Sequence, residues 1–410
     1  MKSVDQETTL RQYLSYLPTN ILADIIWNYR NQKICDLDLV KFFITAKLSK
    51  WDSYREMADG LAANPELQQL LGINSFSPSQ FSRRLRDLNT YHLADLFHRI
   101  ADTYWRFQKN RSGPLERVGM LSIIDGTHIK VPVQTMKWAA ISKDSAGVKM
   151  HVKVAVANAN SIYPEKVMMS TGNISDIEMV NHLVTDNDTL YVMDRGYGHK
   201  TKMGGWLERG IDFVVRVQYK FTFETLISYA PQHPQVLRNE KVSMKTHKKP
   251  LRYIEFVDDK GSVYHLMTSR LDLTEQEVLD VYKSRWQVEL FFKWIKQHVK
   301  FDHILSFSPT GIWNQLYISL ITYALAEIMH VAEASDKTTW SFFRKIRTFL
   351  FRSIHSLREW LLRVKKPSRG RQKITVRTEK KIDYGGFAVA VRPLSKEHFE
   401  SKKSQRNTKS

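Results

Sequence analysis

The spacing of apolar residues changes near residue 118, and the two parts of the chain predict different structures. Before that point apolar residues recur at helical spacing, as over 13–29 and 37–48. After it, short β-branched and apolar runs predict strands, and helical patterns lie between them. The predicted strands are 118–133, 151–159, 189–193 and 212–218, and the predicted helices are 174–184 and 202–210. This mixture predicts an α/β fold built around one sheet.

A polar, lysine-rich segment then interrupts this pattern. Residues 251–259 and 262–269 predict a hairpin that turns at Lys260-Gly261. Because this segment separates two parts of the predicted core, we interpret it as a β-rich insertion. The predicted divisions are a helical N-terminal domain (1–112), the first part of the core (113–218), the insertion (219–273), the second part of the core (274–362) and a basic tail (363–410).

Two helix starts carry clear capping signals. Ser77 followed by Pro78 predicts an N-cap and a first helical residue. Arg83, Arg84 and Arg86 follow within that helix, and they either enter a DNA groove or lie solvated on a surface helix. Farther along, Thr274 with Glu277 forms a capping box and predicts a long helix that runs to about residue 297.

The charge balance narrows the class of partner. The chain has 62 Lys and Arg against 42 Asp and Glu, a net charge of +20. This excess attracts polyanions, so nucleic acid is favoured over an anionic membrane surface. The predicted tail, with fifteen basic and four acidic residues, either contacts DNA or keeps the chain soluble.

Other features favour a cytoplasmic protein that is not embedded in a membrane. Cys35 is the single cysteine, so no intramolecular disulfide can form. The first residues lack the apolar run of a signal peptide. The most apolar stretch, 316–331, is shorter than the roughly 20 residues of a membrane span and predicts a buried helix.

Two aspartates follow apolar runs directly. Asp125 comes after Leu-Ser-Ile-Ile and precedes Gly126, and Asp194 comes after Leu-Tyr-Val-Met and precedes Arg195-Gly196. Ligands of open α/β sheets gather where strands end, so both carboxylates are candidate site residues. Each could instead cap a helix or form a turn.

A third candidate lies in the predicted long helix. Tyr282, Arg285, Glu289 and Lys296 fall on one helical face, and the rest of the helix is mostly apolar. If that helix is buried, the charged face needs a metal ion or a phosphate as its partner. On a surface helix, Arg285 and Glu289 would form an ion pair that contributes only about 0.3–0.5 kcal/mol.

These residues together resemble the DDE transposases of insertion sequence family four. That group is named for a Tyr-x2-Arg-x3-Glu-x6-Lys motif, which the four residues from Tyr282 to Lys296 match at every spacing. Asp-Gly-Thr-His at 125–128 and Asp-Arg-Gly-Tyr at 194–197 resemble the family's two aspartate motifs. The motifs span about 121–325 in the family's order, and the resemblance implies a ribonuclease-H-like core with a β-rich insertion.

The resemblance also implies a chemistry. Asp125, Asp194 and Glu289 would bind Mg2+ or Mn2+, Arg285 and Lys296 would contact phosphates, and Tyr282 the terminal nucleotide. The enzyme would cut double-stranded DNA at terminal inverted repeats, pass through a hairpin, and join the element to target DNA as a homodimer in a synaptic complex. A nuclease with the same core, or a DNA-binding regulator derived from a transposase, remains as an alternative.

Several neighbouring residues have two open interpretations. Lys149, His151 and Lys153 alternate along a predicted strand and face either DNA or the protein interior. Asp176 begins a helix or supports the site as another acid, and the helical role is favoured. His128 is interpreted as local structure, and Trp286 as one possible platform for a flipped base.

Overall fold

The computed structural model describes residues 7–18, 34–107, 117–158, 161–299, 303–335 and 337–362. All of these residues belong to one compact unit that spans 1–362. The predicted basic tail lies outside the described residues, so its contact with DNA stays a prediction.

Helices make up the described residues before 108, as the apolar spacing predicts. They are α1 (Thr9–Ser15), α3 (Asp36–Ser49), α4 (Tyr54–Ala62), α5 (Pro65–Leu71), α6 (Pro78–Asp87) and α7 (Thr90–Phe107). The predicted cap of α6 is confirmed, since Ser77 and Gln80 form a reciprocal capping box and Pro78 is the first helical residue. Of the predicted helix over 13–29, residues 13–15 belong to α1, which ends at Ser15, and the part from residue 19 onward lies outside the described residues.

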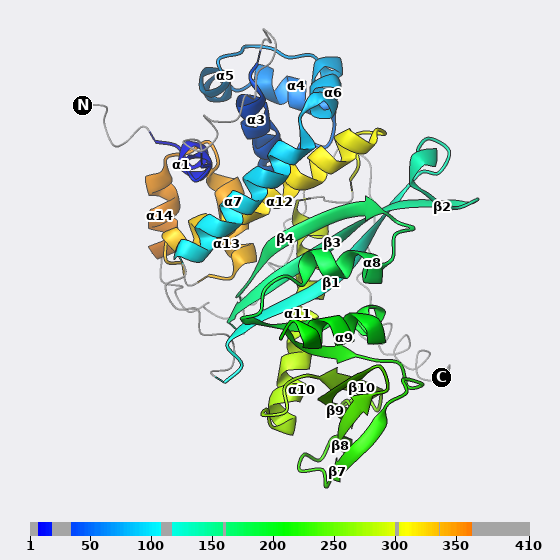
Figure 1. Ribbon diagram of the computed structural model, residues 1–410. Helices are drawn as coiled ribbons and strands as arrows, with labels where there is room; N and C mark the ends of the chain where they lie inside the picture. The colour runs from blue at the N-terminus through cyan, green and yellow to red at the C-terminus, as the bar shows by residue number, and fades with distance from the viewer. Residues whose placement is uncertain are drawn as a thin grey trace, which may run out of the picture. The chain divides into compact units, whose positions relative to one another are not determined.

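One large mixed sheet forms the centre of the described chain (Figure 1). Its strands are β1 (Met120–Val131), β2 (Ala140–Ser142), β3 (Ser145–Asn158), β4 (Ser161–Thr171), β5 (Thr189–Met193), β6 (Asp212–Arg216), β7 (Glu224–Tyr229), β8 (Val236–Met244), β9 (His247–Val257) and β10 (Val263–Thr268). The order is β2-β3-β1-β5-β6-β10-β9-β8-β7, and β4 also pairs with β3. β3 is antiparallel to β1, whereas β5 and β6 run parallel to it.

Strand β4 was not predicted from the sequence. Its segment contains Pro164, and proline cannot donate to a ladder, which argues against a strand. In the structure Pro164 pairs with Val154 next to a register shift, on a strand that has β3 as its partner. An edge position and an irregular register tolerate the missing N–H group.

The predicted hairpin is confirmed as β9 and β10, with Gly261 at a positive φ of 82° in its turn. The predicted β-rich segment does not form a separate sheet, however. β10 pairs antiparallel with β6, with Leu266 opposite Arg216, so β7–β10 extend the central sheet. The backbone N–H and C=O groups of β6 on the side away from β5 therefore form hydrogen bonds with β10.

Helices cover both faces of the sheet. On β5, Tyr191 and Met193 pack in one apolar cluster with Trp206 of helix α9, whereas Leu190 and Val192 belong to the other cluster. This alternation follows from the two-residue repeat of a strand. Helices α8 (Asp176–Leu183) and α9 (Lys200–Glu208) cover the face to which Tyr191 and Met193 point (Figure 1). The helices that follow β10 pack in the cluster of Leu190 and Val192, on the other face (Figure 1).

The predicted long helix is divided in two. The capping box of Thr274 and Glu277 is confirmed and begins α10 (Glu275–Ser284). α11 (Trp286–His298) follows after Arg285 alone, whose dihedrals remain helical at φ −52° and ψ −32°. The interruption therefore separates the helices by one residue.

The buried helix predicted over 316–331 is confirmed as part of α12 (Pro309–Ala332). Among the described residues it is the one helix long and apolar enough to cross a membrane, but 83% of its most apolar window is buried inside the protein. It packs against α7, α3 and α6. The last described helices are α13 (Thr339–Phe349) and α14 (Ile354–Leu362).

Candidate active site

Asp125 lies within strand β1 and not at its end. The prediction that it reaches a site because its own strand ends there was therefore wrong. Strand β1 continues for six residues beyond it, to Val131. The parallel pairing with β5 stops at Ile124 opposite Met193. Asp125 is therefore the first residue of β1 beyond the end of β5, and the missing neighbour opens the sheet there.

Asp194 is placed by the same strand end. It follows Met193, the last residue of β5, and precedes a short 3-10 helix, Arg195–Tyr197. Its Oδ1 atom accepts a hydrogen bond from the Tyr282 hydroxyl at 3.2 Å and lies 3.7 Å from Nη1 of Arg216. A tyrosine of α10 and an arginine of β6 thus hold this carboxylate.

Glu289 lies in the first turn of α11, and Arg285 connects it to the sheet. The Nη2 atom of Arg285 lies 2.6 Å from Oε1 of Glu289, and its Nη1 atom lies 3.7 Å from Oδ2 of Asp125. The Arg285 side chain is 16% exposed, so this is not the solvated surface pair considered as the alternative. The guanidinium of Arg285 therefore lies between the carboxylates of Asp125 and Glu289.

Asp125 and Asp194 face a cleft of about 410 Å³. Its lining includes Asp125, Asp176 and Asp194 together with the turn after β5, 195–199. The pKa of Asp125 is raised to about 6, mainly by burial and also by the nearby carboxylates of Asp194 and Asp176, against the lowering effects of the Gly126 N–H and Arg285. Concentrated negative charge in a partly buried cleft favours a cation there.

The carboxylate oxygens suit Mg2+ or Mn2+, which prefer oxygen ligands. Asp125, Asp194 and Glu289 come from three separate elements and are joined through Arg285 and Tyr282. Among the described residues, no group of three or more Asp, Glu, His or Cys side chains lies close enough together to hold a metal ion. The donor chemistry therefore fits a divalent metal, and the acids must still approach one another to share it.

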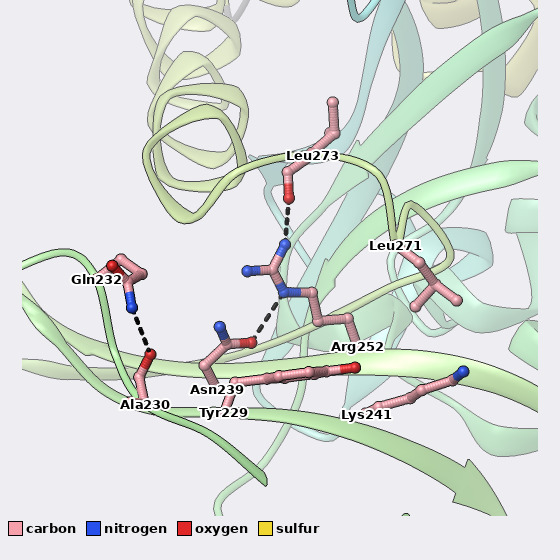
Figure 2. Close-up of a pocket in the computed structure, with 8 residues that line it drawn as sticks. All are labelled: Tyr229, Ala230, Gln232, Asn239, Lys241, Arg252, Leu271 and Leu273. Atoms are coloured by element: carbon pink, nitrogen blue, oxygen red, sulfur yellow. Dashed lines mark hydrogen bonds between the residues drawn. The ribbon is translucent and has the colours of Figure 1, made fainter. Parts of the chain in front are cut away.

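A second cleft, of about 510 Å³, lies away from these acids (Figure 2). Arg252, only 9% exposed, donates from Nε to Asn239 Oδ1 at 2.9 Å and from Nη1 to the carbonyl of Leu273. Asn239 in turn donates to Glu275 at 2.6 Å. Because Leu273 and Glu275 flank the N-cap of α10, this network fixes the start of the helix that carries Tyr282.

The remaining candidates divide into residues exposed to solvent and residues with partners inside the protein. Lys296 of α11 is partly exposed, and its charge helps lower the pKa of His128, so the two lie near each other. Arg83 is exposed on α6, but Arg84 pairs with Asp36 at 2.6 Å and both side chains are largely buried. Trp286 is 58% exposed.

The alternating residues of β3 face the protein. Lys149 pairs with Asp176 at 2.8 Å, and the fully buried His151 lies 3.2 Å from the same carboxylate. Lys153 pairs with Glu165 and Asp186. The structural interpretation of these three residues is therefore the correct one.

The comparisons with known proteins agree with this arrangement. The sequence profile of the transposase DDE domain matches residues 117–325, about half of the chain, and this range holds Asp125, Asp194 and Glu289. This chain belongs to the DDE transposase family. The predicted family is confirmed, while the narrower Tyr-Arg-Glu-Lys subgroup stays a prediction.

Relatives with curated descriptions are also transposases. A probable transposase for insertion sequence element IS5377 of Geobacillus stearothermophilus is 24% identical, over 76% of this chain and 81% of its own. A putative transposase of Sinorhizobium fredii is 28% identical, over 62% of this chain and 72% of its own. The solved piggyBac transposase synaptic complex with hairpin DNA aligns at a TM-score of 0.44 and 11% identity, over 87% of this chain and 80% of that one. As a member of the DDE transposase family, the protein is a DNA-cleaving and DNA-transferring enzyme.

The sequence did not single out Arg216 and Tyr197, although both lie at this DDE site. Arg216 is the last residue of β6, directly after an apolar run, so the reasoning used for Asp194 would have found it. Tyr197 donates to Asp176 at 3.4 Å from inside the core. No pattern in the sequence distinguishes it from an ordinary core aromatic.

Proposed function

We propose that this protein excises and inserts an insertion sequence by metal-dependent DNA cleavage and strand transfer. The observation that carries the proposal is that Asp125 of β1 and Asp194 at the end of β5 line one cleft, and that Arg285 connects Asp125 to Glu289 of α11. Asp125 and Asp194, which are 69 positions apart in the chain, line this cleft together because the sheet opens where β5 stops. A DDE transposase uses such an acidic triad as its centre.

In this proposal Asp125, Asp194 and Glu289 hold Mg2+ or Mn2+. The bound ions would activate a water or a 3′-hydroxyl and stabilise the leaving oxygen of a phosphodiester. Arg285, held between two of the acids, contacts a phosphate beside the cut. Tyr282 orients Asp194 through its hydroxyl, whereas its ring is buried against Phe256 and Tyr264 and does not present a face to the terminal nucleotide.

We interpret the sheet as a ribonuclease-H-like core extended by the predicted insertion. The order β4-β3-β1-β5-β6, with β4 and β3 forming an antiparallel unit with β1, and β5 and β6 parallel to β1, supports this interpretation. The proposed boundaries remain 113–218 and 274–362 for the core, with a helical DNA-binding domain before it and a basic tail after it. The four strands β7–β10 correspond to the proposed insertion.

The proposed partners are double-stranded DNA at the terminal inverted repeats and at the target. A net charge of +20 supports phosphate binding, and Arg83 and Lys296 are the exposed cations that we assign to it. Two DNA ends have to be joined together, which favours a homodimer in the synaptic complex, and we propose a hairpin intermediate. Such DNA lies in the nucleoid, in the bacterial cytoplasm.

The test is metal-dependent cleavage of a donor plasmid that carries the element's own ends. The parent should cleave and join in Mg2+, and Glu289→Gln should lose cleavage while it still binds the end DNA. Glu359→Gln, which makes the same change on an exposed side chain of α14, is the matched control and should cleave like the parent.

Each outcome separates the alternatives. Equal cleavage by the parent and Glu289→Gln would exclude Glu289 from the triad. Cleavage without strand transfer would favour a nuclease on the same core. DNA binding with no cleavage by any variant would favour a regulator.

A further inference from the structure

Asp176 reaches the cleavage site from the opposite face of the sheet. Asp125 is paired with Val152 and shares its face, which α11 covers. Gly126 is paired with His151, so these two residues point to the other face, which α8 covers. Asp176 is the first residue of α8, yet it lines the same cleft as Asp125. The two carboxylates line the same cleft, at the place where the sheet is open because β5 has ended.

Three groups hold one oxygen of Asp176. Its Oδ1 atom lies 2.8 Å from Lys149 Nζ, 3.2 Å from His151 Nδ1 and 3.4 Å from the hydroxyl of Tyr197. His151 is fully buried, and within the described residues its Nδ1 atom has no well-aligned hydrogen-bond partner although it is aimed at this carboxylate. A lysine and a tyrosine from different elements would not be needed to cap α8, because Ser175 and Glu178 already form its capping box.

One glycine makes room for this carboxylate. A Cβ atom added to Gly126 would lie 2.8 Å from Asp176 Oδ1, too close for real atoms. A Cβ atom added to Gly196 would lie 3.5 Å from Oδ2, an ordinary contact distance. The second oxygen therefore faces the turn that follows Asp194. Gly126 directly follows Asp125, so the space that Asp176 needs gives this glycine a physical reason.

We propose that Asp176 is a fourth acidic residue of this site and helps to bind the divalent metal, with Oδ1 fixed by its three neighbours and Oδ2 directed into the cleft. The inference rests on the proposed metal-dependent function. A purely structural role, in which Asp176 only neutralises Lys149, predicts that any carboxylate able to reach Lys149 would serve. A metal-binding role requires this carboxylate at this position, since ligand placement sets affinity.

The experiment measures equilibrium Mn2+ binding to the full-length protein by electron paramagnetic resonance. The variants are Asp176→Asn, Asp176→Glu and Asp125→Asn, with Asp188→Asn as a matched control on an exposed aspartate. Thermal unfolding without metal reports on folding. Bound Fe2+ with peroxide and ascorbate should also cut the backbone near its ligands, and we expect cuts near 125, 176 and 194.

We expect Asp176→Asn to weaken Mn2+ binding by about 10–100-fold. Asp176→Glu should weaken it as well, because the extra methylene displaces the carboxylate, while it keeps the unfolding temperature of the parent. Unchanged Mn2+ affinity in a folded Asp176→Asn protein would overturn the inference. So would full recovery of affinity in Asp176→Glu, which would indicate charge neutralisation alone.

Failure of the proposed function has a different signature. If the parent bound no Mn2+, or if Asp125→Asn bound it like the parent, the metal site itself would be wrong and the inference would fall with it. If Asp125→Asn lost binding and Asp176→Asn kept it, the proposed function would stand and only the role of Asp176 would fail.

Discussion

Replacement of Glu327 by Gln should stabilise this protein above neutral pH. Glu327 lies in the middle of α12 and is 3% exposed. Burial raises its pKa from an ordinary value of 4.5 to about 7, because its hydrogen bonds with Tyr323 and Thr339 do not offset the loss of water around the charge. The folded protein therefore holds this side chain more easily as the neutral acid.

The size of the effect follows from the two pKa values. The folded-state pKa lies above the unfolded one, so the protonated form contributes stability below pH 4.5, and this contribution is lost as the pH rises through about 7. One pKa unit corresponds to roughly 1.4 kcal/mol, so the full loss is about 3 kcal/mol. Gln has nearly the shape of the neutral acid and does not ionise, so it escapes this loss.

The assay is urea unfolding of the full chain at pH 5 and pH 8. The parent should lose stability between these values, whereas Glu327→Gln should lose less, and at pH 8 the variant should exceed the parent by up to about 3 kcal/mol. Glu359→Gln removes a charge from the exposed surface of α14 and should change stability by no more than about 0.5 kcal/mol.

One result would refute this reasoning. If Glu327→Gln were no more stable than the parent at pH 8, and the difference between them were the same at both pH values, then the ionised carboxylate would be well solvated or paired in the folded protein. The large pKa shift and the stability argument built on it would both be wrong.

Four further substitutions test other parts of the structure. Asn314→Leu should lower the free energy of unfolding in urea by about 2–4 kcal/mol, because the buried Asn314 amide donates to two carbonyls at the end of α6 and its removal leaves both without a donor. An unchanged urea midpoint would contradict this. Arg84→Ala should destabilise the protein by about 1–3 kcal/mol, since it leaves a largely buried carboxylate without its partner. Arg83→Ala should leave the unfolding curve unchanged and weaken DNA binding several-fold, with a shallower salt dependence, and equal DNA affinity would remove Arg83 from the interface. Tyr282→Phe should slow cleavage without unfolding the protein, because Asp194 loses a hydroxyl donor, and parent-like cleavage would show that the hydroxyl is dispensable.

Local patterns predicted most of the secondary structure. The N-cap signal at Ser77 and the capping box at Thr274 place helix starts correctly because a cap depends on residues only a few positions apart. The Lys260-Gly261 turn predicts the β9–β10 hairpin for the same reason. Strand β4 escaped because the effect of Pro164 depends on which neighbour it has, and that is a tertiary property.

The position of Asp125 in the cleft shows where reasoning from local sequence patterns fails. Its position after an apolar run suggested a strand end, but β1 continues and it is β5 that stops. Likewise Arg83 and Arg84 look equivalent in the sequence, yet only Arg84 faces Asp36, which lies 48 residues earlier. Which side of a helix meets another element is decided by packing over long separations.

The sequence by itself determined the family, and it predicts the three acidic residues because the chemistry needs particular side chains and the Glu289 helix carries its motif at fixed helical spacing. It also determined the basic character of the protein, which is a sum over residues and does not depend on the fold. The tertiary structure alone decided that β7–β10 extend the central sheet, that Arg285 connects Asp125 with Glu289, and that Asp176 reaches the site beside two glycines. These features join segments tens to more than a hundred residues apart, and hydrogen bonding between strands and the shape of the folded chain bring them together, which no local pattern records.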